Sequence, residues 1–363
     1  MAEIGGTYDE RFRAVRDAFA ASLDRDDVGG SVAVFVDGEP VVDVWGGYAD
    51  AARTTPWERD TIVNVWSTTK TMSALCALVL ADRGAVDLDA PVAEYWPEFA
   101  AAGKGGVLLR HVLGHTAGLP TWHEPITVPE LFDWDGATAR LAAQAPRWEP
   151  GTVGCYHPLT QGFLLGEVVR RVTGRSLGAF FAEEIAGPLG ADFHIGLPAE
   201  HDHRVAPVIP PPAADAAPGL PGERPNPAIV ARDANTAAWR RAEVPSAGGH
   251  GNARSVAAVQ SVLASGGVAG GVRLLSEAGC ARVVQEQFRG VDRYLGVPVR
   301  YGMGYRVEGR TCSWGGWGGS VVVVDLETRM TVAYVMNRML DNGTLGDTRG
   351  LGLVLTAYRA LTA

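Results

Sequence analysis

Lysine is almost absent from this sequence. It occurs only at Lys70 and Lys104, and the other strongly basic residues are arginines. An arginine cannot accept a proton because its guanidinium stays charged in proteins, whereas a buried lysine can lose its proton. Lys104 lies in a glycine-rich turn and is expected at the surface. Lys70 falls inside an apolar helical pattern, which makes it a candidate base.

Other absences exclude whole classes of function. No apolar run is long enough to span a bilayer, and the N-terminus lacks the basic and apolar regions of a secretory signal. The net charge is −9 without a basic stripe, so we expect neither nucleic acid nor a membrane as a partner. The cysteines have no metal-ligand spacing, which favours buried free thiols in a cytoplasmic protein. They are Cys76, Cys155, Cys280 and Cys312.

Signals for a cofactor are also missing. The G-x-S-x-G match at residues 174–178 follows a predicted helix and not a strand, which argues against the elbow of α/β-hydrolases. His201-Asp202-His203 offers two imidazoles, but no further spaced ligands follow, so a solvated loop is favoured over a zinc site. We therefore expect no metal and no cofactor.

The strongest positive signal is the stretch 64–72. Ser67 and Lys70 stand at the start of a run, residues 72–82, that is apolar on every side and predicts a buried helix. Three residues apart, their side chains share one helix face. A hydroxyl beside an amine at the positive end of a helix dipole is a candidate nucleophile with its base. The motif alone also allows a non-catalytic alternative, in which the serine caps the helix and the lysine extends to solvent.

Secondary-structure signals differ between the ends and the middle of the chain. Apolar residues at helical spacing predict a helix over 8–23, and the last stretch, 345–361, is also interpreted as a helix. β-branched runs around turn signals predict hairpins over 31–45 and 320–336. The proline-rich stretch 207–227 predicts a long ordered loop, most simply a surface excursion.

These signals predict an α+β fold. We expect an antiparallel sheet flanked by helices, formed by residues 1–85 and 245–363. A mainly helical domain, residues 86–244 with the proline-rich loop, is expected to be inserted into it.

The order of motifs resembles the serine β-lactamase and penicillin-binding-protein superfamily. The S-x-x-K of Ser67-Thr68-Thr69-Lys70, then Tyr156, then Trp314-Gly315-Gly316 before two late strands carry the resemblance. Within the superfamily the chain is most similar to the class C-like branch, which contains family VIII carboxylesterases and related transacylases. The resemblance implies the β-lactamase-like α/β sandwich.

Two departures from the β-lactamase pattern bear on the substrate. Tyr156-His157-Pro158 replaces Y-x-N, and Trp314-Gly315-Gly316 replaces K-T-G. Without that lysine, no cation from the third motif pairs with a β-lactam carboxylate. The resemblance therefore favours an uncharged ester or amide.

The resemblance implies roles for single residues. Ser67 would be the nucleophile, and its proton would pass to Lys70, or to Tyr156 as tyrosinate or through Lys70. The N–H groups of Ser67 and Trp317 would form the oxyanion hole. Further residues are predicted to bind substrate, although for His157 a packing role is the simpler interpretation. They are Trp66, Trp314, Gly315, Gly316 and His157.

Three functional classes follow from these motifs. The first is a serine esterase that acts on a small-molecule ester or amide through an acyl-Ser67 intermediate. The second is a transacylase that passes the acyl group to an amine or alcohol of a second molecule. The third is a non-catalytic binding module, which the joint presence of Ser67, Lys70 and Tyr156 disfavours.

Overall fold

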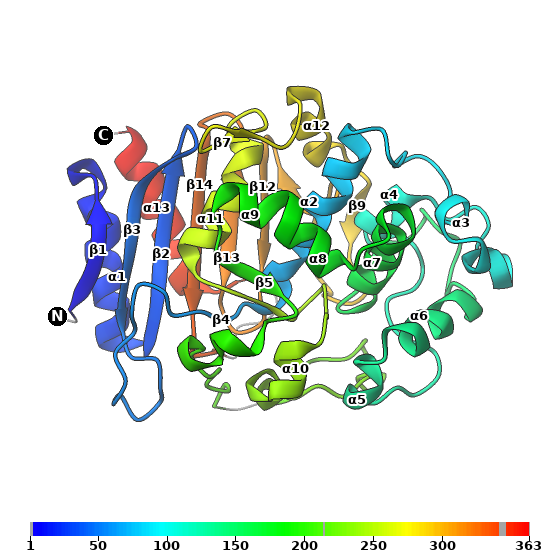
Figure 1. Ribbon diagram of the computed structural model, residues 1–363, viewed down its shortest axis with the longest axis horizontal. Coiled ribbons are helices and arrows are strands. Elements are labelled where there is room, and N and C mark those ends of the chain that lie inside the picture. The colour runs from blue at the N-terminus through cyan, green and yellow to red at the C-terminus, as the bar shows by residue number, and fades with distance from the viewer. Residues whose placement is uncertain (1–2, 213–214, 341–345, 363) are drawn as a thin grey trace.

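A nine-stranded antiparallel sheet forms the centre of the protein. The computed structural model describes residues 3–212, 215–340 and 346–362 (Figure 1). In spatial order, the strands of this sheet are β1 (Ile4–Tyr8), β3 (Glu39–Gly47), β2 (Gly29–Val36), β14 (Met330–Met336), β13 (Val321–Asp325), β12 (Thr311–Gly315), β11 (Arg306–Glu308), β10 (Pro298–Tyr301) and β9 (Phe288–Val291). The two ends of the chain therefore meet where β2 pairs with β14.

Helices cover both faces of this sheet. α1 (Arg13–Arg25) packs with α13 (Thr348–Thr362) on one face (Figure 1). α11 (Ala253–Ala264) lies across β2, β13 and β14 on the other face, beside α2 (Thr69–Asp82). The central strands are buried because both faces are covered, which explains their valine-rich runs. This arrangement confirms an α+β fold.

The middle of the chain forms a helical part, which extends past the β9 end of the sheet (Figure 1). Its α-helices are α3 (Val92–Tyr95), α4 (Leu109–Leu113), α5 (Val128–Leu131), α6 (Trp134–Ala143), α7 (Thr160–Thr173), α8 (Leu177–Phe181), α9 (Gly187–Leu189) and α10 (Ala237–Arg241), and α12 (Glu277–Ala281) follows later in the chain. A small sheet of β4 (Val63–Asn64), β6 (Gly249–Gly251) and β5 (Phe193–Ile195) crosses the predicted domain boundaries. A two-stranded ribbon joins β7 (Val268–Ala269) to β8 (Val272–Arg273). The boundaries at 85/86 and 244/245 therefore stay a prediction.

Local signals predict the ends of elements unevenly. The Asp37-Gly38 turn joins β2 to β3 with positive φ at both residues, as a tight hairpin requires. The helix predicted over 8–23 begins only at Arg13, because the chain before it pairs with β3 as strand β1. That pairing is long-range, and glycines at positions 5 and 6 give no side-chain pattern to predict it. The final helix starts at Thr348, while Leu345 lies outside the described residues.

Lys104 is not at the surface, which corrects the expectation from its glycine-rich turn. The residue is fully buried, and its ammonium donates to the carbonyl oxygens of Ala101, Ala142 and Gln144. Burial lowers the pKa of Lys104 to about 8. Ala101 is a near neighbour in sequence, whereas Ala142 and Gln144 lie at the end of α6, which only the tertiary fold brings beside Lys104.

Candidate active site

Ser67 stands on a strained turn between β4 and α2. The preceding Trp66 has a φ of +49°, in the left-handed region that side chains disfavour. Packing holds it there, because the Trp66 ring lies 5.6 Å from the Trp239 ring and 4.9 Å from the Trp317 ring. Ser67 falls in a single 3₁₀ turn, Trp66–Thr68, and Lys70 in the first turn of α2. The predicted helix therefore begins just after the serine.

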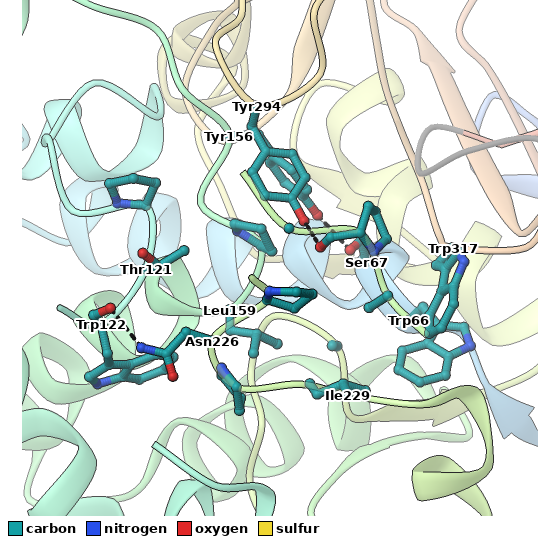
Figure 2. Close-up of a pocket in the computed structure, with 18 residues that line it drawn as sticks. Trp66, Ser67, Thr121, Trp122, Tyr156, Leu159, Asn226, Ile229, Tyr294 and Trp317 are labelled. Atoms are coloured by element: carbon teal, nitrogen blue, oxygen red, sulfur yellow. Dashed lines mark hydrogen bonds between the residues drawn. The ribbon is translucent and has the colours of Figure 1, made fainter. Parts of the chain in front are cut away.

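Three predicted catalytic side chains meet at one point, and Figure 2 shows two of them, Ser67 and Tyr156. Ser67 Oγ lies 2.6 Å from the hydroxyl oxygen of Tyr156, although the residues are 89 positions apart in sequence. Lys70 Nζ lies 3.3 Å from Ser67 Oγ and 4.8 Å from the centre of the Tyr156 ring. This is the contact geometry that a nucleophile with an adjacent base requires.

The surroundings of Lys70 favour an uncharged amine. Its Nζ lies 2.6 Å from the carbonyl oxygen of Pro158 and 2.9 Å from that of Ser246. Burial lowers the pKa of Lys70 well below its usual value, and no carboxylate in the described ranges pairs with it. A neutral amine can donate its two N–H groups to these carbonyls. Its lone pair then faces Ser67 Oγ.

Tyr156 is buried, which bears on the two predicted routes for the serine proton. Burial raises the pKa of Tyr156, while its hydrogen bond with Ser67 acts in the opposite direction more weakly. A tyrosinate is therefore disfavoured. The arrangement favours the route through Lys70, with a protonated Tyr156 hydroxyl against Ser67.

The third motif reaches the nucleophile through a close backbone contact. A Cβ on Gly316 would lie only 2.3 Å from the carbonyl oxygen of Val65, so only glycine fits there. The hydroxyl of Ser320 donates to the same carbonyl at 2.8 Å and lies 2.9 Å from Thr68 Oγ1. The turn that follows β12 is thus fastened to the segment that carries Ser67.

A pocket opens in front of Ser67 (Figure 2). None of the described residues that line it carries a charge. They are Trp66, Ser67, Pro120, Thr121, Trp122, Tyr156, Pro158, Leu159, Ala217, Pro218, Gly219, Pro225, Asn226, Pro227, Ile229, Ala247, Tyr294 and Trp317. Residues 217–229 form one wall, so the proline-rich stretch is not the plain surface excursion that was expected.

The predicted substrate-binding residues separate into two groups. Trp66 and Trp317 line the pocket, whereas Trp314, Gly315, Gly316 and His157 are not among its lining residues. Trp314 is 1% exposed and lies behind Tyr156, with the ring centres 5.6 Å apart. Trp314 therefore does not reach the pocket, because its strand directs the indole into the core. This corrects the expectation that Trp314 contacts substrate directly.

His157 is a packing residue, which corrects its proposed contact with substrate. The imidazole is fully buried, with Nδ1 2.6 Å from the carbonyl oxygen of Cys155. Its Nε2 accepts a hydrogen bond from the backbone N–H of Leu119 at 3.2 Å. Both ring nitrogens are therefore occupied, and burial lowers the pKa of His157 to about 4, which keeps the ring neutral.

Several residues of the pocket were missed from sequence, and two of them, Tyr294 and Asn226, have defined contacts. The Tyr294 ring packs 5.5 Å from the Tyr156 ring, and its hydroxyl donates to the carbonyl oxygen of Pro218. Asn226 bridges the proline-rich wall to residues 122–126 through both of its amide atoms. Neither residue lies in a periodic pattern, although the Asn-Pro pair at 226–227 is a turn signal that could have drawn attention.

The other sequence candidates give no second centre. Asp202, between two histidines, pairs with Arg240 at 2.7 Å and with Arg241. In the described ranges, no three or more His, Cys, Asp or Glu side chains converge as metal ligands would. Among the helices described, none combines the length and the apolar character that crossing a bilayer requires.

Comparison with known proteins agrees with this geometry. The model of one family, described as Beta-lactamase, matches residues 15–355. The chain belongs to the Beta-lactamase family. This confirms the resemblance that the S-x-x-K, Tyr156 and Trp-Gly-Gly motifs indicated.

Individual similar proteins align with nearly the whole chain. Esterase/beta-lactamase LipL of Mycobacterium tuberculosis is 37% identical over 96% of this chain and 86% of its own length. The crystal structure of a family VIII carboxylesterase is 44% identical, with a TM-score of 0.94 over 99% of this chain and 100% of that one. A penicillin-binding protein homologue from Caulobacter crescentus is 37% identical, with a TM-score of 0.90 over 99% and 100% of the two chains.

Proposed function

We propose that this family member is a serine esterase that works through an acyl-Ser67 intermediate. The observation that carries the proposal is the contact of Ser67 Oγ with both Lys70 Nζ and the Tyr156 hydroxyl. Membership of the family and the likeness to esterases support it.

Acylation begins with proton transfer from Ser67 to the neutral amine of Lys70. The serine oxygen forms a bond to the ester carbonyl carbon, and the carbonyl electrons move onto its oxygen. When this intermediate collapses, the bond to the alcohol oxygen breaks. The departing oxygen takes the proton of the Tyr156 hydroxyl, and the Lys70 ammonium returns a proton to Tyr156. Water then cleaves the acyl-serine by the same steps in reverse.

The oxyanion would be held by the backbone N–H groups of Ser67 and Trp317. The carbonyl of Gly316 accepts from the N–H of Gly319 at 3.2 Å, inside the turn. Because the C=O and N–H of a trans peptide point in opposite directions, the Trp317 N–H points out of the turn. No hydrogen bond within the described residues uses that N–H. A donor of this kind typically lowers the barrier by about 3–4 kcal/mol.

The pocket sets the class of substrate. Its uncharged wall of proline, tryptophan and aliphatic side chains fits an uncharged apolar acyl group. A small-molecule ester or amide is therefore the proposed substrate. The four free buried cysteines are consistent with a reducing, cytoplasmic location, which is part of the proposal.

The test is the site of acylation. After incubation with an activated ester, mass spectrometry should place the adduct on the peptide that contains Ser67. Ser67→Ala should abolish both adduct and turnover. Ser73→Ala is the matched control, since Ser73 is buried in α2, the helix that follows Ser67, and its hydroxyl donates to the Pro245 carbonyl at 2.5 Å. An adduct at another residue, or full turnover by Ser67→Ala, would overturn the proposal.

A further inference from the structure

A buried arginine stands behind the turn that carries Trp317. The Arg349 side chain, in the first turn of α13, is only 3% exposed. It lies between two carboxylates, with Nη1 2.6 Å from Asp27 Oδ1 and Nη2 2.5 Å from Asp347 Oδ2. The carboxylates are themselves buried, at 0% and 1% exposure. Such a cluster needs full hydrogen bonding to offset the loss of water.

All five N–H donors of Arg349 have acceptors. Nε donates to Asp347 at 3.0 Å, and the second Nη1 donor reaches the carbonyl oxygen of Arg338 at 3.0 Å. The remaining Nη2 donor reaches the carbonyl oxygen of Gly318 at 2.8 Å. The planar fork of a guanidinium allows only one orientation that satisfies all of these acceptors. The position of the Gly318 carbonyl is therefore fixed relative to the core.

Asp27 anchors this guanidinium from the opposite side. Its Oδ1 accepts from the Tyr334 hydroxyl at 2.7 Å, and its Oδ2 accepts from the Ser22 hydroxyl at 2.5 Å. These partners come from β14 and α1. The network thus connects the turn after β12 to β14 in the centre of the sheet and to α1, which packs on one face of the sheet.

The turn itself leaves no room to move toward this network. A Cβ on Gly319 would lie 2.3 Å from Asp347 Oδ2 and 2.5 Å from Arg349 Nη2, at a φ of +139°. Ser320, the next residue, is fastened to the carbonyl of Val65 in the nucleophile segment. The four residues 316–319 are therefore held from both ends, by the nucleophile segment and by Arg349.

We propose that Arg349 is a positioning residue for the oxyanion hole, which it serves by holding the turn at 316–319 so that the Trp317 N–H points at the developing oxyanion. The proposal rests on the proposed function. Buried ion clusters add little net stability compared with apolar packing, and directional hydrogen bonds to one turn are what apolar packing would not supply.

The experiment compares an ester with its thionoester, in which sulfur replaces the carbonyl oxygen. Sulfur accepts hydrogen bonds poorly, so a correctly placed oxyanion hole favours the ester. Arg349→Lys keeps the charge but cannot reach all the acceptors. We expect its kcat for the ester to fall about 10-fold or more, with little change in KM. The ratio of ester to thionoester turnover should fall by a similar factor.

Two further variants keep the test decisive. Arg204→Lys is the matched control, because Arg204 also forks onto a carboxylate, Asp192, away from the turn. It should leave the ratio unchanged. Gly319→Ala pushes the turn away from an intact ion cluster and should lower the ratio, and it replaces Arg349→Lys if that variant does not fold.

An unchanged ratio in folded Arg349→Lys and Gly319→Ala would overturn the proposal, whatever their activity. An equal fall in Arg204→Lys would also overturn it. The serine adduct forms in either case if the proposed function holds, so the two failures can be told apart.

Discussion

The Lys70 amine touches three oxygens, which are the Ser67 hydroxyl and the backbone carbonyls of Pro158 and Ser246. The two carbonyls accept hydrogen bonds only, so they orient the amine without charging it. Burial makes the uncharged form accessible. An arginine at this position could take no proton, because its guanidinium stays charged.

Substitution of Lys70 and Tyr156 tests whether the two residues act as one catalytic unit. We expect Lys70→Arg and Tyr156→Phe each to cut kcat by at least about 10²-fold, the lower end for loss of an acid–base group. The double variant should lose far less than the product of the two effects, because groups that act together are not additive. Steady-state kinetics on an aryl ester measure all three. Multiplicative losses would mean that the two residues serve separate steps.

The pH profile of the enzyme should report the buried amine. Because burial lowers the pKa of Lys70, the amine is uncharged above that pKa and becomes protonated as the pH falls through it. We therefore expect kcat/KM to fall on the acid side and to stay level toward alkaline pH, since the pKa of Tyr156 is raised.

Thermal melting over the same pH range shows whether the fold survives where activity is lost. Tyr156→Phe should keep the acid limb at a lower overall rate. An alkaline loss that Tyr156→Phe abolishes would instead identify a tyrosinate.

At the scale of elements, the proline-rich segment acts as a wall of the pocket. Asn226 fixes it with three hydrogen bonds: its Oδ1 accepts from the N–H of Ile126 at 2.9 Å, and its Nδ2 donates to the carbonyls of Trp122 and Glu124 at 2.8 and 2.9 Å. Tyr294 holds the other part of the wall through Pro218. Proline has no backbone N–H that would need an acceptor. Such a segment can therefore face an apolar ligand without leaving an N–H group unpaired.

Loosening this wall should change acyl-chain preference. In Asn226→Ala, three backbone groups lose their partners, so we expect KM to rise several-fold for longer acyl esters with a small change for acetyl esters. Asn235→Ala is the matched control, because the Asn235 amide bridges the N–H and C=O of Val208 at 2.7 and 2.9 Å outside the pocket lining. A chain-length series with both variants makes the comparison. Equal effects of the two variants, or equal effects on all chain lengths, would argue against a specificity role.

At the scale of the whole molecule, the sheet and the helical part each supply half of the site. The turn before α2 and the turn after β12 bring Ser67, the proposed nucleophile, and Trp317, the proposed oxyanion donor, from the sheet side. The segment before α7 brings Tyr156, and the loops around Trp122 and Ile229 close the pocket. The result is a site with an uncharged pocket lining, to which the third motif contributes no cation.

This architecture should favour esters over β-lactams. A β-lactam carboxylate finds no charge-assisted hydrogen bond in the described lining, which costs about 1.5–3 kcal/mol. That is a factor of roughly 10 to 100 in rate or affinity. Comparison of kcat/KM for a cephalosporin and an aryl ester measures it. Faster lactam cleavage would refute this interpretation of the pocket.

Whether a second molecule binds in this pocket decides between hydrolysis and acyl transfer. An acceptor that binds in the pocket competes with water for the acyl-serine, because a bound and oriented group reacts far faster than one from bulk. With one activated ester and a series of amines and alcohols, free acid that is unaffected by every acceptor supports the esterase. Acid formation that one acceptor suppresses with saturation supports the transacylase.

The sequence by itself determined what depends on near neighbours along the chain. Ser67 and Lys70 share a face because they are three positions apart in sequence, and the Asp37-Gly38 turn and the Gly174 helix cap follow from local backbone preference. The order of motifs was enough to indicate the family and to select Tyr156 as a candidate catalytic residue.

Only the tertiary structure decided which side chains reach the pocket. Trp314 and Trp317 are three residues apart in the same motif, yet one lies behind Tyr156 and the other faces the substrate space. Lys104 is buried and Arg349 holds a distant turn because acceptors from remote segments surround them. Such contacts join groups tens to hundreds of positions apart, and no local spacing encodes them, since a side chain's direction is set by how the elements pack.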